Sequence, residues 1–234
     1  MAQAANTWRT RNSGIMMTSF ISAELRPTVA PGETAMPKPT DSNRFLLWID
    51  AVGGYLVSTG DRVRIGQMTP GNDVEVPIFA DLARHHATLR RDGESYLVEP
   101  VHSVRVNGRT IDRTTIVGDG ATLELGRGVE LRLRQPNPLS TTACLEIASR
   151  HRTQPTTSGI VLMAETCVLG PAASSHIVCR GWSRNVVLHH LGDSLYCVTE
   201  GAFAVGGVVC QRRGLVKPGA QVVGDEFTFS MESA

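Results

Sequence analysis

The sequence predicts an all-β fold, because it is rich in turn residues and its apolar residues fall into short runs. Of its 234 residues, 23 are Gly and 12 are Pro. Asp92-Gly93 and Asn107-Gly108 each lie between short alternating apolar runs, and such pairs favour hairpins because Asn and Gly tolerate the positive φ of a tight turn. The second half of the chain also repeats the first, which predicts two tandem β-sandwiches.

The charge and cysteine content narrow the functional class. Lys plus Arg number 23 and Asp plus Glu 22, so no overall field attracts nucleic acid or an anionic membrane. No run reaches the roughly 18 to 20 apolar residues of a membrane-spanning helix, and the apolar segment 15–21 is too short for a signal peptide. The five Cys form no C-x-x-C pair, which favours a reducing compartment over a zinc site or a disulfide framework. We therefore expect a cytoplasmic protein that uses no cofactor or metal and binds neither nucleic acid nor membrane.

Residues 1–43 have the composition of a disordered tail. Prolines are spread among its Thr, Ala, Gly and Ser residues, at Pro27, Pro31, Pro37 and Pro39. Such a segment buries too little apolar surface to order itself. Order is predicted to begin with a strand at 45–50, which Gly53-Gly54 turns into a second strand at 55–57.

The most specific pattern lies between residues 65 and 108. It comprises Ile65-Gly66-Gln67, a strand-like segment Asn72-Asp73-Val74-Glu75-Val76-Pro77, then Leu82-Ala83-Arg84-His85-His86-Ala87, a hairpin turning at Asp92-Gly93, and Val106-Asn107-Gly108. This order resembles the forkhead-associated (FHA) domain, a β-sandwich that reads phosphothreonine in other proteins. The family pattern is a Gly-Arg turn, an Asn-Asp-Ile strand, Ser-Arg-x-His and Asn-Gly-Thr-x-Val-Asn-Gly. The resemblance implies a non-catalytic interaction module linked to Ser/Thr kinase signalling.

The repeat sets the predicted domain boundaries. Gly93 and Gly192 are 99 residues apart (192 − 93), and the same spacing relates 45–49 to 144–148, 106–108 to 205–207 and 120–121 to 219–220. Ile65-Gly66 matches Leu169-Gly170 at a spacing of 104 (169 − 65), so an insertion lies near 150–158. A spacing that returns after an insertion indicates a true repeat. The predicted organisation is a disordered tail at 1–43, FHA-like domain 1 at 44–135, a proline-containing linker at 136–142 and a degenerate FHA-like domain 2 at 143–233.

The repeat also predicts where the cysteines lie. It aligns Cys144, Cys167, Cys197 and Cys210 with Phe45, Val63, Val98 and Ile111. A free Cys is a small and frequently buried hydrophobe. We therefore expect these thiols on core strands and not in a metal or redox site.

The positions that hold phosphate in the family have changed in this sequence. The resemblance implies that phosphate is held by the Arg after the first Gly, the Ser of Ser-Arg-x-His and the Asn of Asn-Gly-Thr. In the first copy these positions hold Gln67, Ala83 and His102. In the second copy they hold Pro171, Trp182 and Gly201, unless the loop shifts by one residue so that Ser183-Arg184 supplies a Ser-Arg pair.

Substitute donors are available in the same segments of the first copy. The candidate phosphopeptide-binding residues are Gln67, Arg84, His85, His102, Ser103, Arg105 and Asn107. Arg84 and Arg105 are the best of them, because they lie in loops expected to meet at one end of the sandwich and guanidinium binds phosphate in a bidentate fork. Their alternative role is a surface ion pair with Asp81 or Glu99.

Two further expectations concern histidine and catalysis. The resemblance implies that His86 is structural, buried and bonded to backbone, and His85 should point the other way on an extended chain. We find no Gly-x-Ser-x-Gly, phosphate-binding Gly-x-x-x-x-Gly-Lys or His-Glu-x-x-His motif, so we expect no enzyme. The predicted partner is a protein or phosphothreonine peptide; a phosphate-independent scaffold or dimerisation protein is the alternative, and the oligomeric state is open.

Overall fold

The computed structural model describes residues 43–234, and all regular elements in this range are β-strands. The predicted all-β class is confirmed for this part of the chain. The predicted tail, except for Asn43, and the segment 15–21 lie outside the described residues. None of the described residues forms a helix that could cross a membrane.

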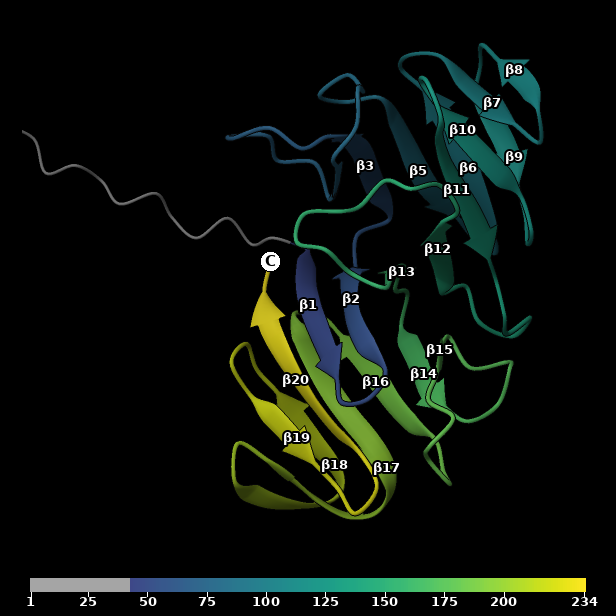
Figure 1. The fold of residues 1–234 in the computed structure, drawn as a ribbon. Helices are drawn as coiled ribbons and strands as arrows, with labels where there is room; N and C mark the ends of the chain where they lie inside the picture. Colours follow the sequence, from purple (N-terminus) through teal and green to yellow (C-terminus); the bar gives the residue numbers. More distant parts are fainter. Residues whose placement is uncertain (1–42) are drawn as a thin grey trace, which may run out of the picture. The chain divides into compact units, whose positions relative to one another are not determined.

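The first half of the chain contains short strands joined by turns and loops (Figure 1). They are β1 (Arg44–Ile49), β2 (Gly53–Ser58), β3 (Arg62–Gln67), β4 (Val76–Ile78), β5 (Ala87–Asp92), β6 (Ser95–Pro100), β7 (Val104–Val106), β8 (Arg109–Ile111), β9 (Thr115–Val117), β10 (Thr122–Leu125) and β11 (Val129–Arg134). Strands β4-β3-β5-β6-β9 form a separate five-stranded sheet.

The predicted hairpins of this half are present. Strands β5 and β6 are joined at Gly93, which has a φ of 59°, and β7 and β8 at Asn107 and Gly108, with φ values of 49° and 78°. The predicted strand at 72–77 is shorter than expected, because regular pairing covers only Val76–Ile78. The side chain of Asn72 binds neighbouring loops instead of extending that strand.

The second half of the chain continues the larger sheet. Its strands are β12 (Ala143–Ile147), β13 (Gly159–Leu162), β14 (Thr166–Gly170), β15 (Ile177–Val178), β16 (Val186–Leu191), β17 (Ser194–Val205), β18 (Val208–Val216), β19 (Gln221–Val223) and β20 (Thr228–Ser233). This sheet has 15 strands in the order β15-β14-β16-β17-β19-β20-β1-β2-β13-β12-β11-β10-β7-β8, with β18 paired to β17.

Two hydrophobic cores form where these strands pack. The first core contains buried side chains from the five-stranded sheet and from β10 to β13, among them Leu89, Leu131 and Leu145. The second contains buried side chains from β14 to β20, among them Leu188 and Phe229. Burial removes apolar surface from water and is the main driving force for folding.

The cysteines lie in or against the second core, as predicted. Cys167 and Cys197 are fully buried, together with Cys179. Cys144 and Cys210 are partly buried and pack against that core. No disulfide joins these five residues.

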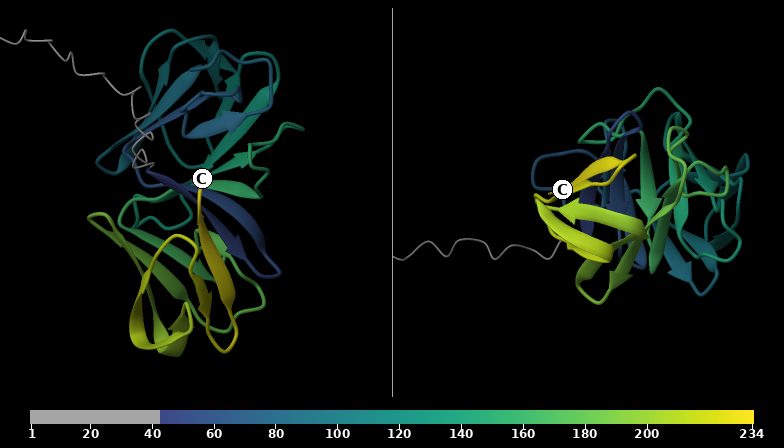
Figure 2. Two further views of the ribbon diagram at one scale, coloured as in Figure 1. Left: turned by 90° about the vertical axis from the view of Figure 1, so that its left-hand side faces the viewer. Right: turned by 90° about the horizontal axis from the view of Figure 1, so that it is seen from below.

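The hairpin β1–β2 lies beside strands that are distant in sequence. In Figures 1 and 2 it lies next to the yellow strand β20, and β1 pairs with β20 while β2 pairs in parallel with β13. Phe45, Leu47 and Ile49 therefore belong to the second core, whereas Leu46 belongs to the first. Strand β12, which follows the predicted linker, pairs with β11.

Candidate functional site

Three loops meet at one end of the first core, and we call them the rim: residues 68–75, 79–86 and 101–103. His86 joins two of them. Its Nδ1 accepts a hydrogen bond from the Ala83 N–H at 3.3 Å, and its Nε2 donates to the Ser103 carbonyl at 2.9 Å. The ring is 4% exposed. The predicted structural role of His86 is confirmed. Its hydrogen bonds also confirm that the loops 79–86 and 101–103 meet.

The end of β3 and the loop 68–75 lie close to the backbone of the loop 79–86. A Cβ added to Gly66 would lie 1.9 Å from the Arg84 carbonyl oxygen, so only Gly fits here. The Gln67 N–H donates to the Ala83 carbonyl at 2.9 Å. Asn72 Nδ2 lies 2.7 Å from the carbonyl oxygen of Gln67 and 2.9 Å from that of Arg84. Asn72 was not among the predicted site residues, although its place in the Asn-Asp motif is the signal that could have identified it.

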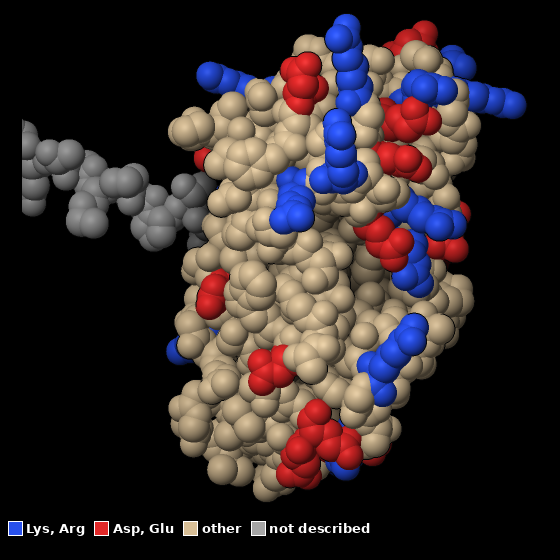
Figure 3. Space-filling model, viewed as in Figure 1, with Lys and Arg blue, Asp and Glu red and all other residues tan. Residues whose placement is uncertain are grey.

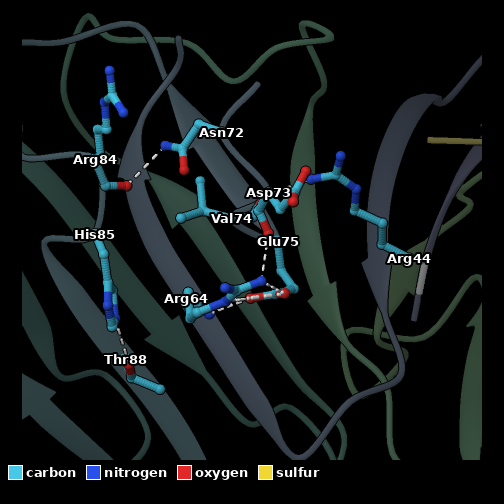
Figure 4. Close-up of polar contacts among 9 residues, drawn as sticks. All are labelled: Arg44, Arg64, Asn72, Asp73, Val74, Glu75, Arg84, His85 and Thr88. Carbon is cyan, nitrogen blue, oxygen red and sulfur yellow. Dashed lines mark hydrogen bonds and ion pairs between the residues drawn. The ribbon is translucent and has the colours of Figure 1, made fainter. Parts of the chain in front are cut away.

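Arg84 projects from this fixed backbone into solvent. Arg84 is exposed. Its guanidinium forms no hydrogen bond or ion pair with any described residue. Figure 4 shows the side chain pointing away from the ion-paired Arg64 on β3. Of the other predicted residues, His102 and Ser103 lie in the rim and are exposed, whereas Gln67 is the last residue of β3, next to the rim, and is half-buried. These four residues therefore lie in or next to segments that hydrogen bonds hold together.

His85 faces away from Arg84, as Figure 4 shows. Its Nε2 lies 2.8 Å from Thr88 Oγ1, on the side of Arg64 and Glu75. Burial lowers the pKa of His85, and the positive charge of Arg64 lowers it further. Burial alone would raise the pKa of Glu75, but hydrogen bonds from Arg64 outweigh it and the pKa is below its usual value. His85 is therefore predominantly neutral at pH 7 and does not share the surface on which Arg84 lies.

The two remaining candidates belong to the β7–β8 hairpin. Arg105 lies on strand β7 and not in the preceding loop, which corrects its predicted position. Its guanidinium pairs with Glu124 at 2.8 Å and also donates to the Gly108 carbonyl. The expected partners Asp81 and Glu99 are therefore wrong for Arg105, because Glu99 binds Arg62 and Arg90. Asn107 Oδ1 accepts the Thr122 N–H at 2.9 Å and stabilises a turn.

The corresponding loop of the second half is closed by its own side chains. Trp182 is buried against Phe227, with ring centroids 5.5 Å apart. The backbone N–H of Ser183 donates to the Glu226 carboxylate at 2.9 Å, and its hydroxyl donates to the same oxygen. These bonds lower the pKa of Glu226. Arg184 donates to the Glu200 carbonyl at 3.0 Å.

Residues 43–234 contain no cluster of three or more His, Cys, Asp or Glu side chains arranged to hold a metal ion. On the face in Figure 3, basic and acidic side chains are interspersed over the upper half, and the lower half carries wide uncharged areas.

The family model for the FHA domain matches residues 57–126 of this chain. Residues 57–126 are therefore similar to the FHA domain family. The rim loops and His86 all lie inside the matched range. FHA domains are interaction modules and not catalysts.

Several solved Mycobacterium tuberculosis structures are similar to this chain. The second FHA domain of the ABC transporter Rv1747 is 21% identical, with a TM-score of 0.27, over 51% of this chain and 89% of that one. EmbR in complex with a low-affinity phosphopeptide is 22% identical, with a TM-score of 0.28; the match covers 36% of this chain and 22% of that one. The FhaA FHA domain complexed with the intracellular domain of Rv3910 is 22% identical, with a TM-score of 0.27; the match covers 35% of this chain and 91% of that one. No curated protein matches the chain.

Proposed function

We propose that the FHA domain of this chain binds phosphothreonine peptides of a protein partner, with Arg84 as the main phosphate contact. The observation that carries the proposal is the exposed Arg84 guanidinium, which has no partner among residues 43–234 on a loop whose backbone is fixed by Gly66 and Asn72. A phosphothreonine presents close to two negative charges and three acceptor oxygens. A fixed loop with a free guanidinium matches that ligand.

The other rim side chains add weaker contacts. Gln67 and His102 replace the family Arg and Asn and can donate hydrogen bonds, whereas Ala83 replaces the Ser and donates none from its side chain. A hydrogen bond to a charged group contributes about 1.5–3 kcal/mol. We therefore expect lower affinity than a rim with the complete family set would give, with Arg84 carrying most of the preference for phosphate.

The decisive experiment compares binding of a degenerate phosphothreonine peptide pool with its unphosphorylated twin. In the wild-type chain the phosphorylated pool should bind more tightly. Arg84→Gln should weaken phosphopeptide binding by about tenfold to a hundredfold, the equivalent of one charged hydrogen-bond pair. Binding of the unphosphorylated pool should stay unchanged.

Arg105→Gln is the matched control. It also removes one Arg from the matched range 57–126, but that Arg is already paired with Glu124. An exposed ion pair contributes only about 0–1 kcal/mol to stability, so this variant should keep both its melting temperature and its phosphate preference. Equal losses in the two variants would contradict the assignment of Arg84.

The second candidate function is a phosphate-independent scaffold. The replacement of the family Arg and Ser by Gln67 and Ala83 favours it. A wild-type chain that binds both peptide pools equally would support this function and overturn the phosphate proposal.

For the second half of the chain we propose a degenerate FHA-like domain that binds no phosphopeptide. The matching loop buries Trp182, and Ser183 is occupied by Glu226. A carboxylate held by these donors would repel an incoming phosphate. The cytoplasmic location and the linker at 136–142 stay predictions.

A further inference from the structure

Equivalent strands of the two halves lie next to each other. Strands β2 and β13 pair in parallel, with Val57 opposite Val161. Their spacing of 104 residues (161 − 57) equals the spacing between Ile65-Gly66 and Leu169-Gly170. This pairing places the hairpin β1–β2 beside the hairpin β12–β13, which the repeat makes its counterpart.

Each hairpin pairs with the last strand of the other half. Leu47 on β1 is opposite Met231 on β20, and Leu145 on β12 is opposite Leu133 on β11. The two arrangements are the same, with a spacing of 98 residues both between Leu47 and Leu145 (145 − 47) and between Leu133 and Met231 (231 − 133). The structural match thus differs by one residue from the spacing of 99 that the sequence suggested for these strands.

The buried side chains follow the same exchange. Leu47 lies in the second core and its counterpart Leu145 lies in the first. On the opposite faces the assignment reverses, since Leu46 lies in the first core and Cys144 packs against the second. On β1 and β12 a side chain and its counterpart therefore contact different cores, whereas on β2 and β13 Leu56 and Ile160 share the first core.

The insertion in the second hairpin also completes the first half. Thr153 is fully buried and forms an isolated bridge with Ile78 on β4. The Phe79 N–H donates to the Arg152 carbonyl at 2.9 Å, and the Gln154 N–H donates to the Pro77 carbonyl at 3.1 Å. An uncovered sheet edge exposes unpaired backbone groups, and this segment covers the edge of β4.

Two side chains of the first half bind the residues that flank the hairpin β12–β13. The Tyr96 hydroxyl donates to the Thr141 carbonyl at 2.7 Å, and Arg91 donates to the Met163 carbonyl at 3.2 Å. We propose that the chain folds by reciprocal exchange of hairpins between its halves, so that β12–β13 completes the FHA domain and β1–β2 completes the second core. The unit that presents the rim is then residues 62–163, and not the 44–135 that the linear repeat predicts.

The experiment uses the full chain with a specific protease site introduced at Leu139, which is 96% exposed. A disulfide needs Cα atoms about 4.4–6.8 Å apart, a distance that directly opposed antiparallel residues satisfy. Arg132 is opposite Glu146 across β11 and β12. Oxidation of the variant Arg132→Cys, Glu146→Cys followed by cleavage should give two pieces joined by a disulfide on a denaturing gel.

The matched control is Glu146→Cys with Ser230→Cys. Without exchange, β12 would pair with β20 and this second disulfide would form inside the C-terminal piece. Hairpin exchange predicts that it does not form. The chain without engineered cysteines shows the background from its native thiols.

Size-exclusion chromatography after cleavage supplies the second measurement. With hairpin exchange inside one chain, the cleaved pieces should elute together at the mass of one chain until denaturant is added. Separate folded pieces, or a disulfide between residues 146 and 230, would overturn the proposal. Linked pieces that elute as a dimer would show exchange between two copies and overturn the intramolecular assignment. The test reads strand pairing and not ligand binding, so its outcome is independent of the proposed function.

Discussion

At the scale of single residues, Gly66 shows how backbone packing positions a side chain that binds. Its missing Cβ lets β3 approach the carbonyl of Arg84, and the approach fixes the loop from which the guanidinium projects. The sequence identified Gly66 through the family motif. It did not show that the contact is with the backbone of the candidate binding residue itself.

Gly66→Ala should therefore disturb both stability and binding. The new Cβ meets a backbone oxygen that has no rotamer to change, and overpacking of this kind costs about 1–3 kcal/mol. Urea unfolding should show that loss, and the preference for phosphorylated peptide should fall with it. Gly118→Ala is the control, because a Cβ there meets nothing within 4 Å; its unfolding free energy should change by no more than about 0.5 kcal/mol. Equal effects of the two changes would argue against the close approach.

At the scale of elements, the strands of the second half decide which thiols react. Burial raises the pKa of the Cys144, Cys179 and Cys197 thiols to about 12. Burial likewise raises the pKa of Cys167 well above its usual value. Cys210 lies on β18, beside the exposed Val208 and Val209, and is only partly buried. The linear repeat placed Cys210 with the other core thiols and could not show that β18 pairs on one side alone.

We expect one fast thiol and four slow ones when the native chain meets a thiol reagent at pH 8. The thiolate is the reactive form, and the raised pKa of the buried groups keeps it scarce at that pH. Mass spectrometry should locate the fast label on Cys210, and Cys210→Ser should remove it. In denaturant all five cysteines should react. Fast labelling of Cys167 or Cys197 in the native chain would contradict their burial in the second core.

At the scale of the whole molecule, the two cores share strands and should unfold together. Strand β1 contributes Leu46 to the first core and Leu47 to the second, and β13 contributes Ile160 and Val161 in the same way. Loss of either core would expose buried side chains that support the other. The described part of the chain is therefore expected to behave as one cooperative unit.

Tryptophan fluorescence can test this cooperativity. Trp48 packs against the first core and Trp182 belongs to the second. The chain has a third tryptophan, Trp8, so in a Trp8→Phe background Trp182→Phe leaves a reporter of the first core and Trp48→Phe a reporter of the second. In each variant the fluorescence and far-UV circular dichroism transitions in urea should coincide. Two separated transitions in either variant would show that the cores unfold independently.

The sequence by itself determined the all-β class, the hairpins at Gly93 and Asn107-Gly108, and the structural role of His86. These features depend on local turn geometry and on short motifs, which are written in neighbouring residues. It also pointed to Arg84 as a candidate, through the position of that residue in the motif.

Only the tertiary structure separated Arg84 from Arg105, because the ion pair with Glu124 depends on which strands lie side by side. It also decided which half each hairpin completes. The repeat gives both hairpins the same pattern of buried residues, so local sequence is compatible with either pairing. The choice is made by long-range contacts such as Val57 with Val161 and Ile78 with Thr153, which no local pattern records.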